Sequence, residues 1–261
     1  MKKYQHNFTI LSNSAVNEEH FIMELQCREP MGLVKPGQFV QIKIDDSPTT
    51  FLRRPLSIHD AVTSKGILKL LIQKKGDGTR KLSTLKKGDI VNLLYPLGNG
   101  FRLPENKNLL LVGGGCGVAP LLLLARELKA RNCKITTLIG ARSATHLTIP
   151  DAYTEFGDVL LTTEDNSTGT KGFVIHHEIF RHGMDIIDGI YCCGPDPMMK
   201  AVARLAKTLN KSCQISLEQS MACGIGACLC CIVDTKKGHV CTCTEGPVFD
   251  YQELSGWGDK E

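Results

Sequence analysis

The sequence predicts an antiparallel β-barrel, then an α/β domain built on a parallel sheet, and a cysteine-rich segment at the C-terminal end. In residues 1–102, short stretches of alternating apolar and polar residues are separated by turn signals, as in an antiparallel barrel. In residues 103–212, continuous apolar strands alternate with helical stretches, which is typical of βαβ units. Six of the twelve cysteines then lie between Cys223 and Cys243, inside the segment 213–261. We expect the chain to divide at these bounds.

Composition excludes several classes of protein. With 42% hydrophobic and 22% charged residues the chain resembles an ordinary soluble globular protein, and its net charge of +4 gives no indication of nucleic acid or a membrane surface as partner. No apolar run reaches the roughly eighteen residues of a membrane span, and the first residues, MKKYQHNFTILSN, are too polar for a signal peptide. We therefore expect a cytoplasmic protein, in which clustered cysteines bind metal or carry out redox chemistry.

The first part contains two strands and two stretches suited to a nucleotide cofactor. Residues 37–44 (GQFVQIKI) alternate as a half-buried strand does, and residues 66–74 (GILKLLIQK) predict another strand. Residues 53–57 (RRPLS) offer guanidinium groups and a hydroxyl for a phosphate and a polar ring edge. Residues 76–79 (GDGT) offer backbone N–H groups in a turn. Taken alone, either stretch is more often a solvated turn.

The second part predicts a parallel sheet with a glycine loop. The expected elements, in order, are strand 108–114, helix 119–131, strand 134–141, strand ends at 158–165 and 189–197, and helix 198–210. The loop VGGGCGVAP, residues 112–120, lets the backbone approach a pyrophosphate at a helix N-terminus, although a tight turn between strand and helix would look the same. Residues 133–144 lack the acidic residue that marks NAD binding and contain Arg142, which favours NADP or leaves the choice open.

The cysteine segment has the spacing of a plant-type [2Fe–2S] site. Cys223, Cys228 and Cys231 follow the C-x4-C-x2-C pattern, and the fourth thiolate must come from Cys241 or Cys243, between which spacing alone cannot choose. The glycines of the loop allow its backbone to wrap around inorganic sulfides. Zinc is the alternative metal, although structural zinc sites usually pair two separate cysteine knuckles.

These motifs together resemble a known family. Residues 54–57 are similar to the flavin-binding R-x-x-S motif of ferredoxin–NADP reductase-like proteins, and residues 193–198 (CGPDPM) to their C-G-P-x-P-M motif. The segment SLEQSMACGIGACLCC, followed by CTEGPVF, resembles one branch in particular. This branch is the iron–sulfur flavoprotein electron-transfer subunit of NAD-linked dihydroorotate dehydrogenase. The resemblance runs from residue 36 to residue 250 and implies FAD, a [2Fe–2S] cluster and NAD as cofactors.

The resemblance also implies roles for individual residues. It selects Cys243 as the last ligand, two residues before Glu245-Gly246-Pro247, so Cys230 should point away from the cluster. The implied metal ligands are Cys223, Cys228, Cys231 and Cys243, and Cys193 lies at the contact of flavin and nicotinamide as the candidate catalytic residue. The implied cofactor-binding residues are Arg54, Pro55, Leu56, Ser57, Leu71, Ile72, Gln73, Gly78, Thr79, Gly113, Gly114, Gly115, Gly117, Gly194 and Pro195.

The implied function is electron transfer in pyrimidine biosynthesis. Electrons would pass from the FMN of a catalytic subunit through [2Fe–2S] and FAD to NAD+, in a heterotetramer of two plus two subunits. A reductase subunit of a bifurcating transhydrogenase or a cytoplasmic hydrogenase is the alternative within the same class. A zinc-stabilised nucleotide-binding regulator is the alternative from another class. His176, His177 and His182 have no catalytic spacing and are expected at the solvated surface.

Overall fold

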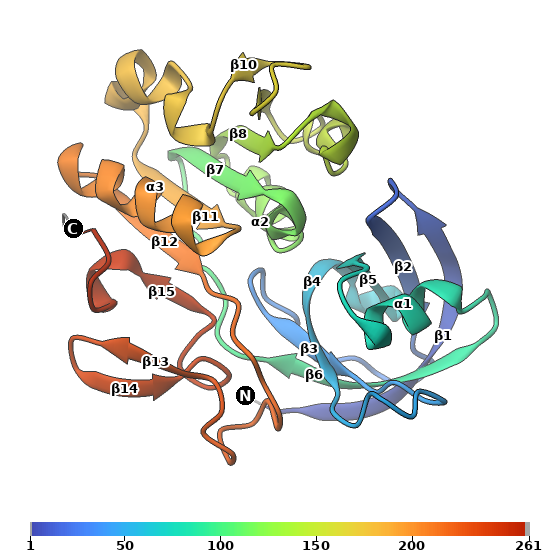
Figure 1. The fold of residues 1–261 in the computed structure, drawn as a ribbon. Helices are drawn as coiled ribbons and strands as arrows, with labels where there is room; N and C mark the ends of the chain where they lie inside the picture. The colour runs from blue at the N-terminus through green and yellow to red at the C-terminus, as the bar shows by residue number, and fades with distance from the viewer. Residues whose placement is uncertain (1, 259–261) are drawn as a thin grey trace.

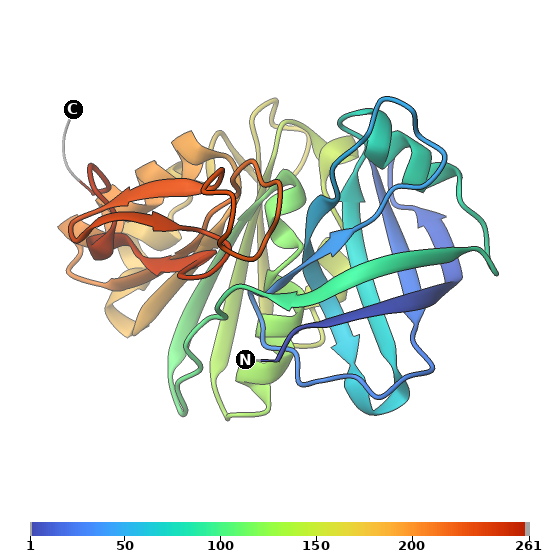
Figure 2. The same cartoon turned by 90° about the horizontal axis from the view of Figure 1, so that it is seen from below.

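The N-terminal part is a closed antiparallel barrel, as predicted (Figures 1 and 2). The computed structural model describes residues 2–258, and its barrel strands run in the order β1-β2-β5-β4-β3-β6. Along β3 the side chains of Val40 and Ile42 fill the barrel interior, while Phe39 and Gln41 face outward and are covered by other parts of the chain. The strands are β1 (Tyr4–Ala15), β2 (His20–Gln26), β3 (Phe39–Ile42), β4 (Arg54–Val62), β5 (Ile67–Gln73) and β6 (Ile90–Leu97).

One α-helix and a short 3-10 helix (Thr63–Lys65) interrupt the part for which the sequence predicts only strands. Residues 76–79 are not an isolated turn, because they begin helix α1 (Asp77–Thr84). The Thr79 hydroxyl accepts hydrogen bonds from the N–H groups of Lys75 and Gly76, and Leu82 on the same helix packs into the barrel core. A β-turn and the first turn of a short helix share the same local residues, and only the burial of Leu82 distinguishes them.

The second part is a seven-stranded sheet in the order β10-β9-β8-β7-β11-β12-β15. Its strands are β7 (Asn108–Gly114), β8 (Lys134–Ala141), β9 (Asp158–Thr163), β10 (Thr170–Lys171), β11 (Gly189–Cys193), β12 (Ser212–Ser216) and β15 (Val248–Asp250). All neighbours are parallel except β12 and β15. Strands β7 and β8 coincide with the predicted ranges. Helix α2 (Leu121–Lys129) packs with Leu109 and Leu111 of β7, and α3 (Asp196–Thr208) packs with Leu110 and Val112, so the helices cover opposite faces.

The C-terminal segment joins both parts of the molecule. Strands β12 and β15 complete the sheet, while β13 (Ile232–Thr235) and β14 (Gly238–Cys241) form a separate hairpin. The loop of residues 217–231, called the cluster loop below, lies between this hairpin and the barrel (Figure 2). There Met221, Cys231 and Cys243 pack on Phe39 and Leu97 of the barrel. Within residues 2–258 no helix combines the length and apolarity needed to span a bilayer.

Candidate functional site for two nucleotides and an iron–sulfur cluster

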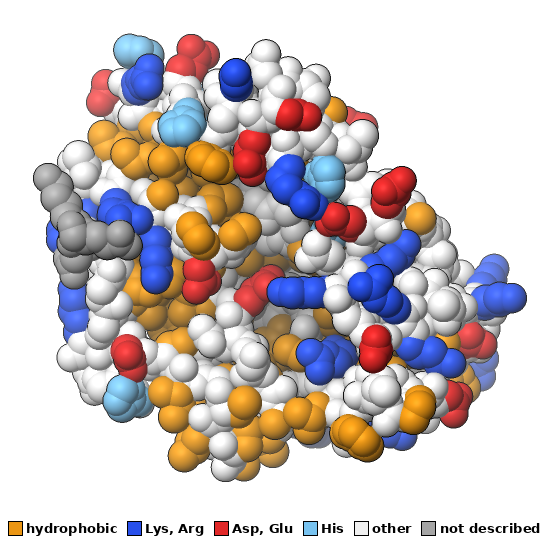
Figure 3. Space-filling view, in the orientation of Figure 1, with side chains coloured by type: hydrophobic (Ala, Val, Ile, Leu, Met, Phe, Trp, Pro, Cys, Tyr) orange, Lys and Arg blue, Asp and Glu red, His pale blue; other side chains and the backbone are white. Residues whose placement is uncertain are grey.

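The two phosphate-binding stretches of the barrel lie side by side. Residues 54–57 begin β4, and a Cβ at Gly78 in α1 would lie 3.4 Å from Cδ of Arg54. Arg54 is exposed, so its guanidinium and the N-terminus of α1 are available to one anion. Lys and Arg side chains gather on the barrel side of a hollow between the two parts of the molecule (Figure 3). This arrangement fits the pyrophosphate of FAD.

The end of strand β5 offers mainly backbone atoms for cofactor binding. The side chains of Leu71 and Ile72 are buried in two hydrophobic clusters, so only their main-chain atoms remain for a cofactor. The Cys116 thiol already donates to the Leu71 carbonyl at 3.8 Å. Gln73 is half-buried, and its amide donates to Glu19 Oε2 at 3.2 Å.

The glycine loop and the C-G-P motif meet at the carboxyl ends of β7 and β11. Gly113 pairs with Cys193 in the parallel ladder. A Cβ at Gly117 would lie 2.4 Å from the Cys193 carbonyl oxygen, so this glycine is required by the contact between the two loops. Gly115, at φ +55°, faces open space. It leaves the backbone free for a pyrophosphate at the carboxyl edge of the sheet, where nucleotides bind to such folds.

Cys193 and Glu218 lie at the contact between sheet and barrel. Cys193 is fully buried, and burial raises the pKa of its thiol well above the usual range, so the thiol stays protonated. Glu218, at the start of the cluster loop, is close enough to influence the pKa values of both Cys116 and Cys193. The Glu218 side chain is exposed, yet partial desolvation by the surrounding protein raises its pKa, and the charge of Lys75 opposes that rise. No motif singled out Glu218, because its neighbours come from distant segments.

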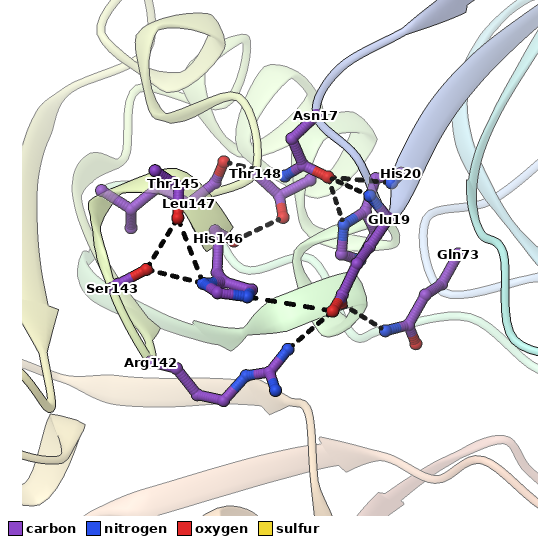
Figure 4. Close-up of polar contacts among 10 residues, drawn as sticks. All are labelled: Asn17, Glu19, His20, Gln73, Arg142, Ser143, Thr145, His146, Leu147 and Thr148. Carbon is purple, nitrogen blue, oxygen red and sulfur yellow. Dashed lines mark hydrogen bonds and ion pairs between the residues drawn. The ribbon is translucent and has the colours of Figure 1, made fainter.

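A polar network holds the end of β8 against the barrel (Figure 4). Arg142 donates from Nη2 to Glu19 Oε1 at 2.8 Å, and His146 lies 3.8 Å from the same oxygen. Hydrogen bonds from Arg142 and Gln73 lower the pKa of Glu19, so it is a carboxylate near neutral pH. Arg142, whose positive charge favoured NADP over NAD, is therefore already paired with the Glu19 carboxylate of the barrel.

The four predicted cluster ligands, three from the cluster loop and Cys243 from the turn after β14, form two thiol pairs. Cys223 lies beside Cys228, whose side chain contributes to lowering the pKa of Cys223, and Cys231 lies beside Cys243. Burial tends to raise the pKa of Cys223, but N–H groups of Ile225 and Cys228, each 3.4 Å from its sulfur, lower it to about 6. In the second pair, burial and the neighbouring Cys231 raise the pKa of Cys243 to about 12, so the Cys243 thiol ionises only when a cation compensates.

The donor set fits a two-iron cluster. No three Cys, His, Asp or Glu side chains in residues 2–258 are grouped to hold a single metal ion. A [2Fe–2S] centre shares four thiolates between two irons, so two pairs are the grouping it needs. The Gly226 N–H donates to Cys243 Sγ at 3.1 Å. Cys231 also contacts Cys241, but Cys243 is the more buried of the two alternatives. The ligand set remains a prediction.

One histidine differs from its predicted position. His176 and His182 are exposed as expected, whereas His177 is buried and accepts a hydrogen bond from the Ile179 N–H at 3.1 Å. It lies in the segment between β10 and α3, and its burial is not revealed by the adjacent residues of the sequence.

The fold and site define a ferredoxin–NADP reductase-like oxidoreductase with an added iron–sulfur segment. Residues 111–204 match the oxidoreductase NAD-binding domain, and residues 218–255 match the iron–sulfur cluster binding domain of dihydroorotate dehydrogenase B. The structure of an NADH-dependent reduced ferredoxin–NADP oxidoreductase is similar over 96% of this chain and 90% of its own, with TM-score 0.85 and 29% identity. A ferredoxin–NADP+ reductase from Neisseria gonorrhoeae shares the fold, with TM-score 0.65 and 17% identity over 78% of this chain and 91% of its own.

Sequence relatives narrow the class to one family. The chain is 41% identical to the electron transfer subunit of dihydroorotate dehydrogenase B (NAD(+)) from Caldanaerobacter subterraneus subsp. tengcongensis, over 94% of this chain and 96% of the relative. The subunit of the same name from Bacillus velezensis is 35% identical, over 95% and 98%. The chain belongs to this family of electron transfer subunits. The predicted resemblance, the fold class and the cofactors FAD, [2Fe–2S] and NAD are confirmed.

Proposed function

We propose that this chain accepts electrons from a dihydroorotate-oxidising, FMN-containing subunit and delivers them to NAD+. The observation that supports this most is the position of the cluster loop, which packs on the outer face of β3 and β6 on one side and reaches the molecular surface on the other. When bound, FAD links the single electrons of a [2Fe–2S] centre to the hydride of a nicotinamide. The chain itself binds, positions and shields these groups.

The main predicted cofactor-binding residues have specific tasks in this proposal. Arg54 and the first turn of α1 hold the flavin pyrophosphate, and Ser57 and the backbone of residues 71–73 hold the flavin ring. The loop 113–117 and Gly194-Pro195 hold the dinucleotide at the carboxyl edge of the sheet. Cys193, kept protonated by burial, would offer a neutral thiol beside the nicotinamide that does not attack the ring as a nucleophile.

The surface for the partner subunit is the exposed apolar part of the cluster loop and its surroundings. Ile225, Leu229 and Ile232 are 45%, 59% and 41% exposed, and Phe51 and Leu52 on the β3–β4 loop are 92% and 50% exposed. Hydrophobic side chains line this edge of the molecule in Figure 3. Large exposed apolar side chains next to a redox centre suit a subunit interface. We expect an assembly of two such chains with two catalytic subunits, in the cytoplasm, where thiols stay reduced.

A bifurcating reductase subunit is the second candidate. It is favoured by the similarity to the NADH-dependent reduced ferredoxin–NADP oxidoreductase over 96% of the chain. The higher identity of 41% to a dihydroorotate dehydrogenase B subunit favours the first proposal. In addition, all four predicted ligand positions are cysteines, whereas we expect an aspartate at one of them in the bifurcating branch.

The test is reconstitution with each kind of partner. The purified chain should contain FAD, iron and sulfide, and should oxidise NADH with an artificial acceptor, but it should leave dihydroorotate unchanged. Adding the FMN-containing catalytic subunit should produce dihydroorotate-driven reduction of NAD+. Dihydroorotate oxidation by this chain alone, or NADH-driven ferredoxin reduction with only a bifurcating partner, would refute the proposal.

A further inference from the structure

Gln41 is a fully buried amide on the outer face of β3. Its side chain is 0% exposed, and among the described residues neither its Oε1 nor its Nε2 has a hydrogen-bond partner. Burying a carboxamide without partners is unfavourable, and native proteins seldom tolerate both atoms unpaired. The neighbouring side chains Val40 and Ile42 point the other way, into the barrel, so the amide is not part of the barrel core.

The segment that covers Gln41 is the cluster loop. A Cβ at Gly224 would lie 2.8 Å from Cγ of Gln41 and 2.9 Å from Nε2. Gly224 directly follows Cys223, the first predicted ligand. On the strand side, the backbone of Gln41 is fixed, because Arg53 donates to its carbonyl oxygen at 3.1 Å and Pro55 lies opposite it in β4. The amide is thus anchored from the flavin-binding strand and directed at the loop that holds the cysteines.

We propose that Gln41 Nε2 donates a hydrogen bond to a sulfur of the [2Fe–2S] centre and thereby raises its reduction potential. The inference rests on the proposed electron-transfer function. Reduction adds one electron, and hence one negative charge, to the cluster and its thiolates. A fixed donor stabilises that extra charge more than the oxidised form. The same residue then sets how readily the cluster takes an electron and, through the cluster, ties the loop to the barrel.

The experiment compares Gln41→Met with wild type in the purified holoprotein. Methionine is unbranched and similar in length but has no N–H. The cluster should become harder to reduce, with the ratio of reduced to oxidised cluster falling about tenfold at a fixed potential, which corresponds to about 59 mV for one electron. Potentiometric titration followed by electron paramagnetic resonance measures this shift. Gln26→Met, an exposed change on β2 of the same barrel, should leave the potential unchanged.

Two further measurements separate this role from simple packing. With 15N-labelled glutamine side chains, pulsed electron paramagnetic resonance of the reduced wild type should detect a coupled nitrogen that is lost in Gln41→Met. The unfolding midpoint of the cluster-free variant should equal or exceed that of cluster-free wild type, because the amide has no protein partner to lose. A shift in the flavin potential alone, or the absence of any coupled nitrogen, would overturn the inference.

The outcome is distinguishable from failure of the proposed function. Wild-type protein without iron, sulfide and a reduced-cluster signal would overturn the electron-transfer assignment together with this inference. A wild-type cluster with the same potential as that of Gln41→Met overturns only the role of Gln41.

Discussion

The barrel meets the rest of the molecule at several contacts, one of them buried between β4 and α2, where the His59 ring lies 2.8 Å from the Ala119 carbonyl oxygen. Two of the other contacts have opposite character. At the contact around the predicted cluster ligands, called the cluster contact below, the chain is tightly packed. The Asn99 N–H donates to the Gly246 carbonyl at 2.5 Å, the Asn99 side chain donates to the carbonyls of Thr244 and Glu245, and a Cβ at Gly98 would lie 2.5 Å from Pro247 Cδ. Phe39 and Leu97 pack there against Cys231 and Cys243 and complete an apolar interface.

The contact between the β1–β2 turn and the residues that follow β8, called the nucleotide contact below, is polar and solvated. Glu19 and Arg142 meet through side chains that are 38% and 63% exposed, and Asn17 reaches the Leu147 carbonyl at 3.4 Å (Figure 4). Such contacts contribute little to stability and exchange readily with water.

The difference follows from what each contact must do. Electron transfer between a cluster and a flavin requires a short and constant distance, which dense packing maintains. A dinucleotide must enter and leave at every turnover, so the contact beside it has to open at little cost. Four predictions test this division, beginning with the largest expected effect.

The first prediction concerns the buried thiol of the tight contact. Cys231→Ser should abolish the [2Fe–2S] signal or make it labile, because Cys231 is 2% exposed and contacts Cys243. The neighbouring Cys230 is exposed, so Cys230→Ser is the matched control and should retain the cluster. Iron and sulfide analysis with electron paramagnetic resonance distinguishes them, and equal loss in both variants would refute the ligand assignment.

The second prediction concerns flavin binding at Arg54. Arg54→Ala should weaken FAD retention by about 1.5–3 kcal/mol, the value of a hydrogen bond to a charged group. The cluster should remain, because its ligands lie in another segment. Flavin content after desalting measures the effect, and Arg28→Ala, which removes an exposed charge near the end of β2, should lose no flavin. Unchanged retention in Arg54→Ala would show that the motif is wrongly assigned.

The third prediction measures how tight the cluster contact is. Gly224→Ala should lower the free energy of unfolding by about 1–3 kcal/mol more than Gly238→Ala does. The reason is that the new Cβ at residue 224 would press on Gln41 and on Leu97 Cδ1, 3.2 Å away. Gly238→Ala is the control, since Gly238 also has a positive φ but open space around it. Denaturant unfolding of both variants gives the difference, and equal costs would show that the contact is loose.

The fourth and smallest prediction concerns the polar contact. Glu19→Gln removes the carboxylate charge that pairs with Arg142 and makes its guanidinium more available to a 2′-phosphate, so the kcat/KM for NADPH relative to NADH should rise about two- to fivefold. Glu18→Gln removes the same charge one residue away and should change the ratio less. The pKa of Glu19 is lowered in the folded state. The effect of its charge on the NADPH-to-NADH ratio should therefore be present at neutral pH and be lost as the pH falls through that pKa. No change in the NADPH ratio would mean that Glu19 does not set the preference.

Local patterns were sufficient for much of this protein. Apolar runs predicted β7 and β8 at their observed bounds, and the C-x4-C-x2-C spacing predicted the iron–sulfur segment. The local residues were not sufficient for α1, where a glycine turn and a helix start look alike. The local residues were also not sufficient for His177, whose burial depends on segments that its neighbours in the sequence do not reveal.

The sequence by itself determined the strand and helix types, the glycine loop and the kind of metal chemistry, because periodicity and spacing act over a few residues. Only the tertiary structure decided which distant residues meet. Arg142 pairs with Glu19, 123 positions earlier, and Gln41 lies under Gly224 through the packing of the cluster loop on the barrel. Such contacts depend on how the barrel docks on the sheet domain, and no local pattern encodes that docking because the burial that drives it is shared among residues from every segment.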